Sequence, residues 1–175
     1  MKLSGGLLAA AVLLAIGGVL LAYAAVQALS DEDPAPVTAE GTTLGEAVVA
    51  GEPATEPFVG LTATEITVGN EELEVVVANE ADERSQGLRG REDTSPYDGM
   101  LFVYGADTLT SFTMSGVTAP LDIGFYAANG DEVDRLEMAP CPAADATCPS
   151  YSSAAPYRFA IETPAGGLPE GAVSG

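Results

Sequence analysis

Apolar residues form one long run at the amino terminus and short alternating runs over the rest of the chain. The long run, Leu3 to Leu29, contains no charge and is interrupted only by Ser4, Tyr23, Gln27 and glycines. A helix of this length reaches roughly 40 Å at about 1.5 Å per residue, and a hydrocarbon core is about 30 Å thick. Residues 1–29 are therefore predicted to be a transmembrane anchor.

The charges that flank this run predict its orientation. Lys2 precedes it and Asp31, Glu32 and Asp33 follow it, so the amino terminus is expected in the cytoplasm and the rest outside. The competing interpretation is a signal peptide cleaved near Ala24 or Ala28, although a signal h-region is usually about 7–15 residues long. The first interpretation predicts a single-pass protein of the cell membrane, and the second a secreted one.

Residues 30–60 are predicted to be a disordered linker. They contain four prolines and several acids, no basic residue and no sustained apolar period. Such a segment buries too little apolar surface to offset its ordering entropy. It is therefore expected to be an extended, charged tether between the membrane and a domain.

Residues 61–175 are predicted to be one extracytoplasmic domain of α+β class. Its period-2 patterns predict strands near 66–68, 73–77, 100–104, 109–117, 121–127, 132–138 and 157–161. Gly69-Asn70 and Asn129-Gly130 are expected hairpin turns, and the one helix is expected at 79–90 with Asn79 as its cap. The result is a compact, β-rich domain, a twisted sheet or partly closed barrel with one main helix.

Composition excludes several classes of function. The chain of 175 residues has no histidine and a net charge of −20, from 26 acidic and 6 basic residues. Ser-His-Asp triads, Cys-His pairs and histidine-bearing metal sites are therefore excluded, and no cofactor or metal site is predicted. Nucleic acid is not expected as a partner, because phosphate binding requires clustered Lys and Arg.

The two cysteines predict a disulfide. Cys141 and Cys148 are separated by six residues, a spacing that fits no standard zinc pattern. Outside the cytoplasm thiols oxidise, so a disulfide is favoured over metal or redox chemistry. Its predicted role is structural.

The arginines are informative because they are few. Arg84, Arg89, Arg91, Arg135 and Arg158 are the only cations of residues 61–175, and the first three lie within eight residues. Each can form a structural ion pair with one of the many carboxylates. The alternative is a pocket for an anionic group.

Several ordered blocks resemble the domain-of-unknown-function 192 family, also called uncharacterised protein family 0127. The blocks are Glu83 to Arg91, Asp98 to Tyr104, Phe112 to Met114, Pro120 to Phe125, Met138 to Cys141, Cys148 to Tyr151 and Tyr157 to Phe159. The resemblance spans about 73 to 165. It implies a compact β-rich α+β fold, commonly exported behind a hydrophobic segment, and no established activity.

The resemblance also indicates which residues to consider. The positions that match the family motif as structural residues are Gly87, Leu88, Gly99, Met100 and Pro120, and the candidate binding residues are Arg84, Arg91, Phe112, Met114 and Asp122. The chain departs from the family signature at Thr113, Ser115 and Gly116, where Trp, a basic residue and Asn are usual. A pocket that uses the Trp and the base would have lost both here.

Asp122 has two interpretations. It is either a buried partner of Arg84 or Arg91, or a carboxylate of a binding pocket.

Two functions follow. The first is a membrane-anchored extracytoplasmic binding or interaction domain of unknown ligand, with an envelope protein as partner, as in an accessory subunit of a cell-envelope complex. The alternative is a hydrolase of envelope polysaccharide, which needs two carboxylates about 5–9.5 Å apart. The scarcity of catalytic side chains favours binding over catalysis, and no residue is assigned a catalytic role.

Overall fold

The structure, a computed structural model, describes residues 43–91, 93–143 and 147–175. The predicted anchor, residues 1–29, and residues 30–42 of the predicted linker lie outside the described residues. Among the described residues, no helix has both the length and the apolar character needed to cross a membrane.

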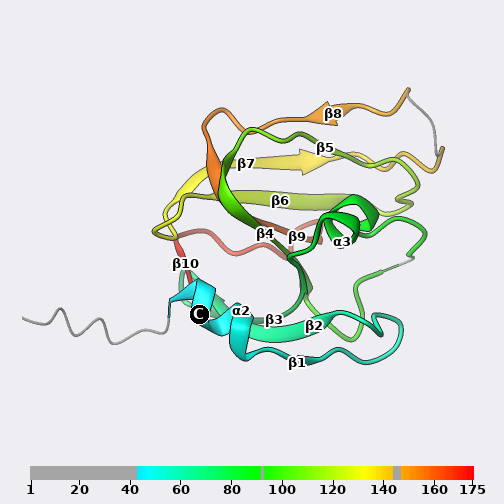
Figure 1. Ribbon diagram of the computed structural model, residues 1–175. Helices are drawn as coiled ribbons and strands as arrows, with labels where there is room; N and C mark the ends of the chain where they lie inside the picture. The colour runs from blue at the N-terminus through cyan, green and yellow to red at the C-terminus, as the bar shows by residue number, and fades with distance from the viewer. Residues whose placement is uncertain (1–42, 92, 144–146) are drawn as a thin grey trace, which may run out of the picture. The chain divides into compact units, whose positions relative to one another are not determined.

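An eight-stranded sheet forms the centre of the domain (Figure 1). Its strands are β1 (Glu52–Pro53), β2 (Thr62–Val68), β3 (Glu71–Ala78), β4 (Gly99–Thr108), β6 (Leu121–Tyr126), β7 (Glu132–Met138), β9 (Tyr157–Pro164) and β10 (Val173–Ser174). They pair in the order β1-β2-β3-β4-β9-β6-β7, and β10 pairs with β2. The β3–β4 pair is parallel and the other pairs are antiparallel.

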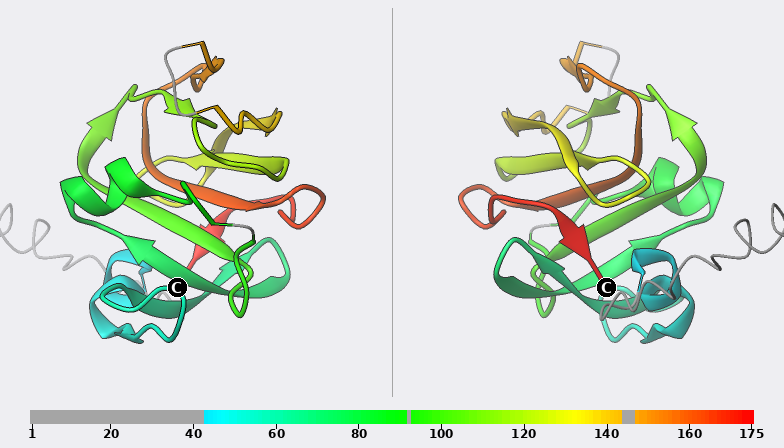
Figure 2. Two further views of the ribbon diagram at one scale, coloured as in Figure 1. Left: turned by 90° about the vertical axis from the view of Figure 1, so that its right-hand side faces the viewer. Right: turned by 90° about the vertical axis from the view of Figure 1, so that its left-hand side faces the viewer.

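The sheet is twisted and open, so the twisted-sheet prediction is confirmed and the barrel alternative is not (Figure 2). β1 and β7 lie at its two ends and do not pair with each other in the described part of the chain. A separate two-stranded sheet of β5 (Phe112–Thr113) and β8 (Ser150–Tyr151) lies at the other end of the domain from the helix α2 (Leu44–Ala50) (Figure 1).

Both faces of the sheet are buried because side chains alternate along each strand. On β4, Met100 and Phe102 belong to one apolar cluster, whereas Leu101 belongs to the other. On β9, Ala160 joins the first cluster and Ile161 the second. The next residue of β9, Glu162, therefore faces the first cluster, which is the face that carries the site described below.

A second helix corrects the predicted linker. Residues 43–60 belong to the folded domain, since α2 buries Leu44, Ala47 and Val48 against β2. Thr43 and Glu46 form a capping box that starts the helix. The predicted linker therefore contains a short amphipathic helix, so residues 43–60 belong to the domain, and the described part of the chain has two helices where one was predicted.

The predicted helix at 79–90 is shorter than expected. It is α3 (Ala81–Gln86), and Glu80 rather than Asn79 is its N-cap, with Glu83 completing a capping box. Gly87 ends the helix at φ 49°, in the left-handed region that favours glycine.

The predicted strand at 109–117 is also shorter, because only Phe112 and Thr113 pair as β5. Local hydroxyl bonds compete with strand pairing here: Thr108 Oγ1 accepts from the Thr110 amide at 3.1 Å. The predicted hairpin of β2 and β3 and the strands β6, β7 and β9 are confirmed.

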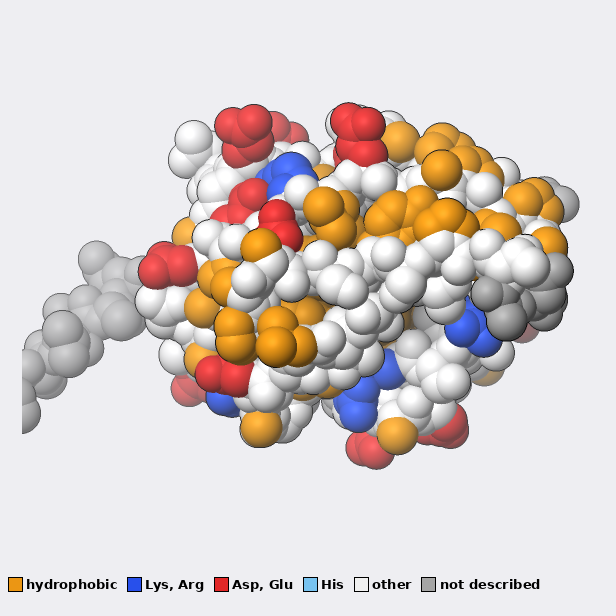
Figure 3. All heavy atoms as spheres, turned by 90° about the horizontal axis from the view of Figure 1, so that it is seen from above, with side chains coloured by type: hydrophobic (Ala, Val, Ile, Leu, Met, Phe, Trp, Pro, Cys, Tyr) orange, Lys and Arg blue, Asp and Glu red, His pale blue; other side chains and the backbone are white. Residues whose placement is uncertain are grey.

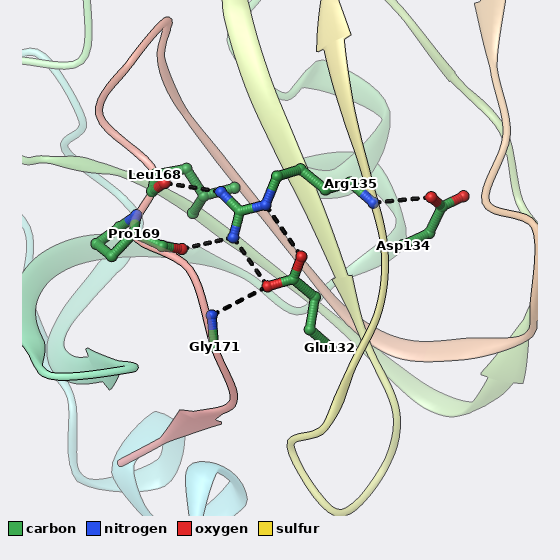
Figure 4. A network of polar contacts seen from close by, with 6 residues as sticks. All are labelled: Glu132, Asp134, Arg135, Leu168, Pro169 and Gly171. Atoms are coloured by element: carbon green, nitrogen blue, oxygen red, sulfur yellow. Dashed lines mark hydrogen bonds and ion pairs between the residues drawn. The ribbon is translucent and has the colours of Figure 1, made fainter.

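Arg135 of β7 forms hydrogen bonds that connect the segment 168–171 to the sheet (Figure 4). Its guanidinium donates to the carbonyl oxygens of Leu168 at 2.7 Å and Pro169 at 2.5 Å, and to both carboxylate oxygens of Glu132 at 3.0 and 2.8 Å. Glu132 in turn accepts from the Gly171 amide at 3.2 Å. These bonds position the segment that enters β10.

Candidate functional site

A cavity of about 480 Å³ opens between α3 and the sheet. Residues 84–89, from α3 and its following turn, form one wall, and residues 110–113 form another. Phe102 and Tyr104 of β4 and Glu162 of β9 reach it from the sheet. We call this cavity the α3 pocket, and its volume lies within the range of about 300–1,000 Å³ that is usual for small-molecule sites.

Arg84 ties α3 to β4 at the side of the pocket. Its Nη1 donates to the carbonyl oxygens of Asn79 and Val103, the latter at 2.9 Å. Its guanidinium also lies 5.0 Å from the centre of the Tyr104 ring, within reach of a cation–π interaction. The side chain is thus held in place while its charge has no carboxylate partner among the described residues.

Arg89 provides a second positive charge at the same wall. It is exposed, in the turn after α3, and lines the pocket. Across the described residues the ion pairs are those of Arg135 with Glu132 and Arg158 with Asp107, so Arg89 is not neutralised by contact. Figure 3 shows acidic side chains mainly toward the margins of one face of the molecule, with separate basic patches on the same face.

Glu162 is the single carboxylate in the lining of the α3 pocket. It lies in β9 between Met100 of β4 and Ile123 of β6, and only 5% of its surface is exposed. Its carboxyl makes no hydrogen bond or ion pair within the described part of the chain. Burial raises the pKa of Glu162 to about 8, because a desolvated carboxylate is disfavoured over the neutral acid.

Aromatic rings surround this carboxyl on the pocket face. Phe102 and Phe112 meet edge to face with centroids 5.0 Å apart, and Tyr104 packs against Tyr157 in the same way at 5.5 Å. The Tyr157 hydroxyl donates to the Thr110 carbonyl oxygen at 2.6 Å, which fixes the start of the 110–113 wall. Burial raises the pKa of both Tyr104 and Tyr157, so both hydroxyls stay neutral.

The predicted disulfide is confirmed, and it adjoins the pocket wall. Cys141 and Cys148 are bonded, and the Cys141 backbone pairs with residues on both sides of Gly116. The Gly116 amide donates to the Cys141 carbonyl oxygen at 2.9 Å, while its own carbonyl accepts from Gly90 at 3.0 Å. The disulfide loop, the segment 115–117 and the turn after α3 are therefore linked by backbone hydrogen bonds.

The structure brings together only some of the predicted binding residues. Arg84 and Phe112 line the α3 pocket. Arg91 instead lines a second cavity of about 50 Å³ and lies over the Phe58 ring at 4.0 Å, and Met114 is buried in the core. Asp122 lines neither cavity.

Asp122 does not form the ion pair that was one of its two interpretations. Its carboxylate accepts from the Gly166 amide at 2.6 Å, and Arg84 and Arg91 are not within ion-pair distance of it in the described residues. Asp122 alternates with Leu121 and Ile123, which belong to the cluster on the pocket face. It therefore lies on the other face of β6.

The residues of the predicted structural motif lie at and around the pocket. Gly87 lines it, and a Cβ there would meet the Phe102 ring at 3.5 Å. Gly99 has no room for a side chain, because an added Cβ would overlap the Glu162 carbonyl oxygen. Leu88 and Met100 are buried, and the exposed Pro120 accepts from the Ala165 amide at 3.2 Å.

Sequence reasoning missed Glu162. The signal was an acid in an otherwise apolar predicted strand, next to Ile161, the last residue assigned to that strand. The chain differs from the family signature at three positions. Thr113 lines the pocket, whereas Ser115 and Gly116 pair with the disulfide loop.

The donors in the described residues do not form a metal site. No group of three or more Cys, Asp or Glu side chains gathers within the ranges 43–91, 93–143 and 147–175. A lone carboxylate such as Glu162 is a poor site for hard cations, which take six or more oxygen ligands.

A family model matches most of the domain. It is DUF192, described as Uncharacterized ACR, and it matches residues 64–174. The resemblance drawn from the sequence blocks is thereby confirmed. Comparison with curated proteins gives no match.

Two solved structures share the fold. One is a protein of unknown function from Novosphingobium aromaticivorans DSM 12444, 23% identical, with a TM-score of 0.58 over 74% of this chain and 96% of that one. The other is described as a candidate transcription regulator from Sinorhizobium meliloti 1021, 25% identical, with a TM-score of 0.53 over 63% of this chain and 90% of that one.

Proposed function

We propose that this chain, which belongs to the DUF192 family of uncharacterised proteins, binds a small organic ligand in the α3 pocket. The observation that carries the proposal is the Glu162 carboxyl, buried beside a cavity without a hydrogen-bond partner in the described residues. The Glu162 carboxyl faces the pocket, and among the described residues the fully buried side-chain atoms without a partner are Arg91 Nε and Tyr126 Oη. A ligand in the pocket can therefore reach this carboxyl and supply the hydrogen-bond partner that the protein does not.

Binding is favoured over the hydrolase alternative. Hydrolysis of a glycosidic bond needs two carboxyl groups facing one cleft. The lining of the α3 pocket contains one, Glu162, and the lining of the second cavity also contains one, Asp93. The pocket therefore offers recognition groups but no pair of acids.

We extend the proposal to the location of the domain, outside the cytoplasm behind an amino-terminal membrane anchor. The uncharged run from Leu3 to Leu29 supports the anchor, and the Cys141–Cys148 disulfide supports an oxidising compartment. Expression of the full chain and protease treatment of intact spheroplasts tests this. A domain that stays protected, with both cysteines reduced, would contradict it.

An accessory role in an envelope complex belongs to the same proposal. A domain tethered at the membrane and able to bind a ligand suits a subunit that presents or senses that ligand. Crosslinking of the intact anchored protein before mild detergent extraction tests for an envelope protein partner. A lone monomer under these conditions would count against the subunit role.

We do not propose nucleic-acid binding, despite the description of the Sinorhizobium protein. The chain has a net charge of −20 and only six basic residues. Proteins bind nucleic acids largely by neutralising phosphates with Lys and Arg.

The binding proposal is tested by filling the pocket. Thr113 lines the α3 pocket, so Thr113→Trp places an indole in it, whereas Thr118→Trp puts the same side chain at an exposed position. In amide NMR titrations with short aliphatic amines, carboxylates and amino acids, we expect shifts at residues 84–89 and 110–113. Thr113→Trp should weaken them by about tenfold or more in affinity, and Thr118→Trp should not. Shifts elsewhere, or shifts insensitive to Thr113→Trp, would refute the proposal.

A further inference from the structure

The α3 pocket carries opposite charges at different depths. Glu162 lies deep, with 5% of its surface exposed, while Arg84 is half-buried and Arg89 is exposed at the outer wall. No ion pair joins Glu162 to either arginine within the described residues. A ligand that satisfies both ends must present a hydrogen-bond donor inside and a negative group outside.

The deep end is suited to an ammonium group. A carboxylate accepts hydrogen bonds and cannot donate them, so an unpaired one is matched by a group rich in N–H donors. Phe102, Tyr104 and Phe112 also line the pocket, and aromatic rings attract cations through their faces. A primary ammonium ion combines both interactions, because it donates hydrogen bonds and carries the charge.

The outer end is suited to an oxyanion. Arg84 is held by two backbone carbonyl groups and by the Tyr104 ring, so little side-chain entropy is lost when an anion binds. Arg89 adds a second guanidinium in the same wall, and such groups bind carboxylate and phosphate in a bidentate manner. Both remain without a carboxylate partner in the described residues of a chain that has 26 acids.

We infer that the ligand of the α3 pocket is a small zwitterion, whose primary ammonium group binds Glu162 among the aromatic rings and whose oxyanion binds Arg84 and Arg89. This inference rests on the proposed binding function and narrows it to one chemical class. Carboxylate and phosphate share the chemistry of the outer end.

Proton release accompanies this mode of binding. Tyr104 on β4 interacts electrostatically with Glu162 and packs against Tyr157 on β9. Arg84 and Arg89 line the same pocket, while β6 presents the apolar Ile123. Because the free Glu162 carboxyl has a pKa of about 8, it is mostly protonated at neutral pH and must ionise to bind an ammonium ion. Affinity should therefore rise by about tenfold per pH unit below that pKa and level off above it.

The test is an amide NMR titration of the folded domain with ω-amino carboxylic acids, from glycine to 6-aminohexanoate. Hexylamine and hexanoate provide the two halves of the zwitterion, and phosphoethanolamine distinguishes a phosphate from a carboxylate. We expect at least one zwitterion to bind about tenfold or more tightly than either half. Its affinity should rise with pH as described.

Variants separate the two ends. Glu162→Gln should weaken zwitterion binding by about tenfold or more and abolish its pH dependence, while Arg89→Gln should weaken zwitterions but not hexylamine. Asp122→Asn is the matched control, because Asp122 lies on the other face of β6 and should change neither.

The outcomes distinguish this inference from the function on which it rests. If hexanoate alone moves the pocket resonances as strongly as the zwitterions, and Glu162→Gln retains that binding, the zwitterion inference is wrong and the binding function stands. If no amine, carboxylate or zwitterion moves the resonances of residues 84–89 and 110–113, both are wrong.

Discussion

Glu162 couples the stability of the domain to its proposed function. Its backbone joins β4 and β6 through β9, and its side chain lines the α3 pocket. The carboxyl therefore cannot move to solvent without disturbing the central strands. An acid on a buried face of the sheet that has no partner in the protein lowers the free energy of unfolding. Such a loss of stability is common at binding sites.

Glu162→Gln should stabilise the domain in a pH-dependent manner. Below the unfolded-state pKa of 4.5, Glu162 is protonated in both states and carries no ionisation penalty. Between 4.5 and about 8 the unfolded chain loses the proton while the folded one keeps it, so the free energy of unfolding falls by about 1 kcal/mol per pH unit. Above about 8 the difference is constant.

Urea denaturation of wild type and variant from pH 4 to pH 9 measures this effect. The two proteins should be similar near pH 4 and differ most above pH 8, with the variant more stable. Glu137→Gln, which changes an exposed acid on β7, is the control and should show no such trend. Parallel pH profiles for wild type and Glu162→Gln would contradict a buried, protonated carboxyl.

Local patterns predicted the strands whose partners are their neighbours in sequence. β2 and β3 follow from alternation around Gly69-Asn70, and β6 and β7 from alternation around Asn129-Gly130. α2 was not predicted, because the Thr43–Glu46 capping box lies among prolines and acids that are typical of a linker. Pairings between distant segments, such as β10 on β2, depend on loop closure that a local pattern does not report.

Some residues of the candidate site were predicted from the sequence and others were not. Arg84 and Phe112 were predicted from residue type and family resemblance, and both line the α3 pocket. Glu162 was not, because its burial follows from the order β4-β9-β6, in which β9 comes from the far end of the chain. Asp122 was predicted to be either an ion-pair partner or a pocket carboxylate, but it accepts a hydrogen bond from the Gly166 amide instead.

Arg135→Met should release the last segment of the chain from β7. The substitution removes donors to Leu168 and Pro169 and to Glu132, while a methionine keeps much of the apolar stem. Arg135 lowers the pKa of Glu132 by hydrogen bonding, so this contribution is present above pH 4.5 and lost as pH falls through the lowered pKa. Removing one partner of such a network costs about 1–3 kcal/mol.

Hydrogen exchange locates the expected effect. The Val173 amide, which donates to Gly130 at 2.8 Å, should exchange faster in Arg135→Met at pH 7, with little change in β3 and β4. Arg158→Met is the control: it removes a partly exposed pair with Asp107, worth at most about 1 kcal/mol, and should leave Val173 protected. Unchanged exchange at Val173 would show that β10 is held by its sheet pairing alone.

The disulfide connects the end of the domain that holds β5 and β8 to the pocket wall. The Gly116 amide donates to the Cys141 carbonyl oxygen, and the Gly90 amide donates to the Gly116 carbonyl oxygen. Gly90 follows Arg89, which lines the α3 pocket. A bond that closes a loop of eight residues stabilises the fold by about 2–3 kcal/mol, mainly by restricting the unfolded chain. Here it also restrains the native segment 115–117, on which one side of the α3 pocket rests.

Replacing Cys141 and Cys148 together by Ser should therefore affect the pocket more than the sheet. We expect faster hydrogen exchange at the Gly116 and Gly90 amides and weaker binding of any pocket ligand, with a folded β2–β3 hairpin. Tyr151→Phe is the control, because it removes the hydrogen bond from the Ala139 amide in the same region and leaves the disulfide intact. If Gly90 kept its protection in the double variant, the α3 wall would be supported by its own packing on β4, and the disulfide would matter for stability alone.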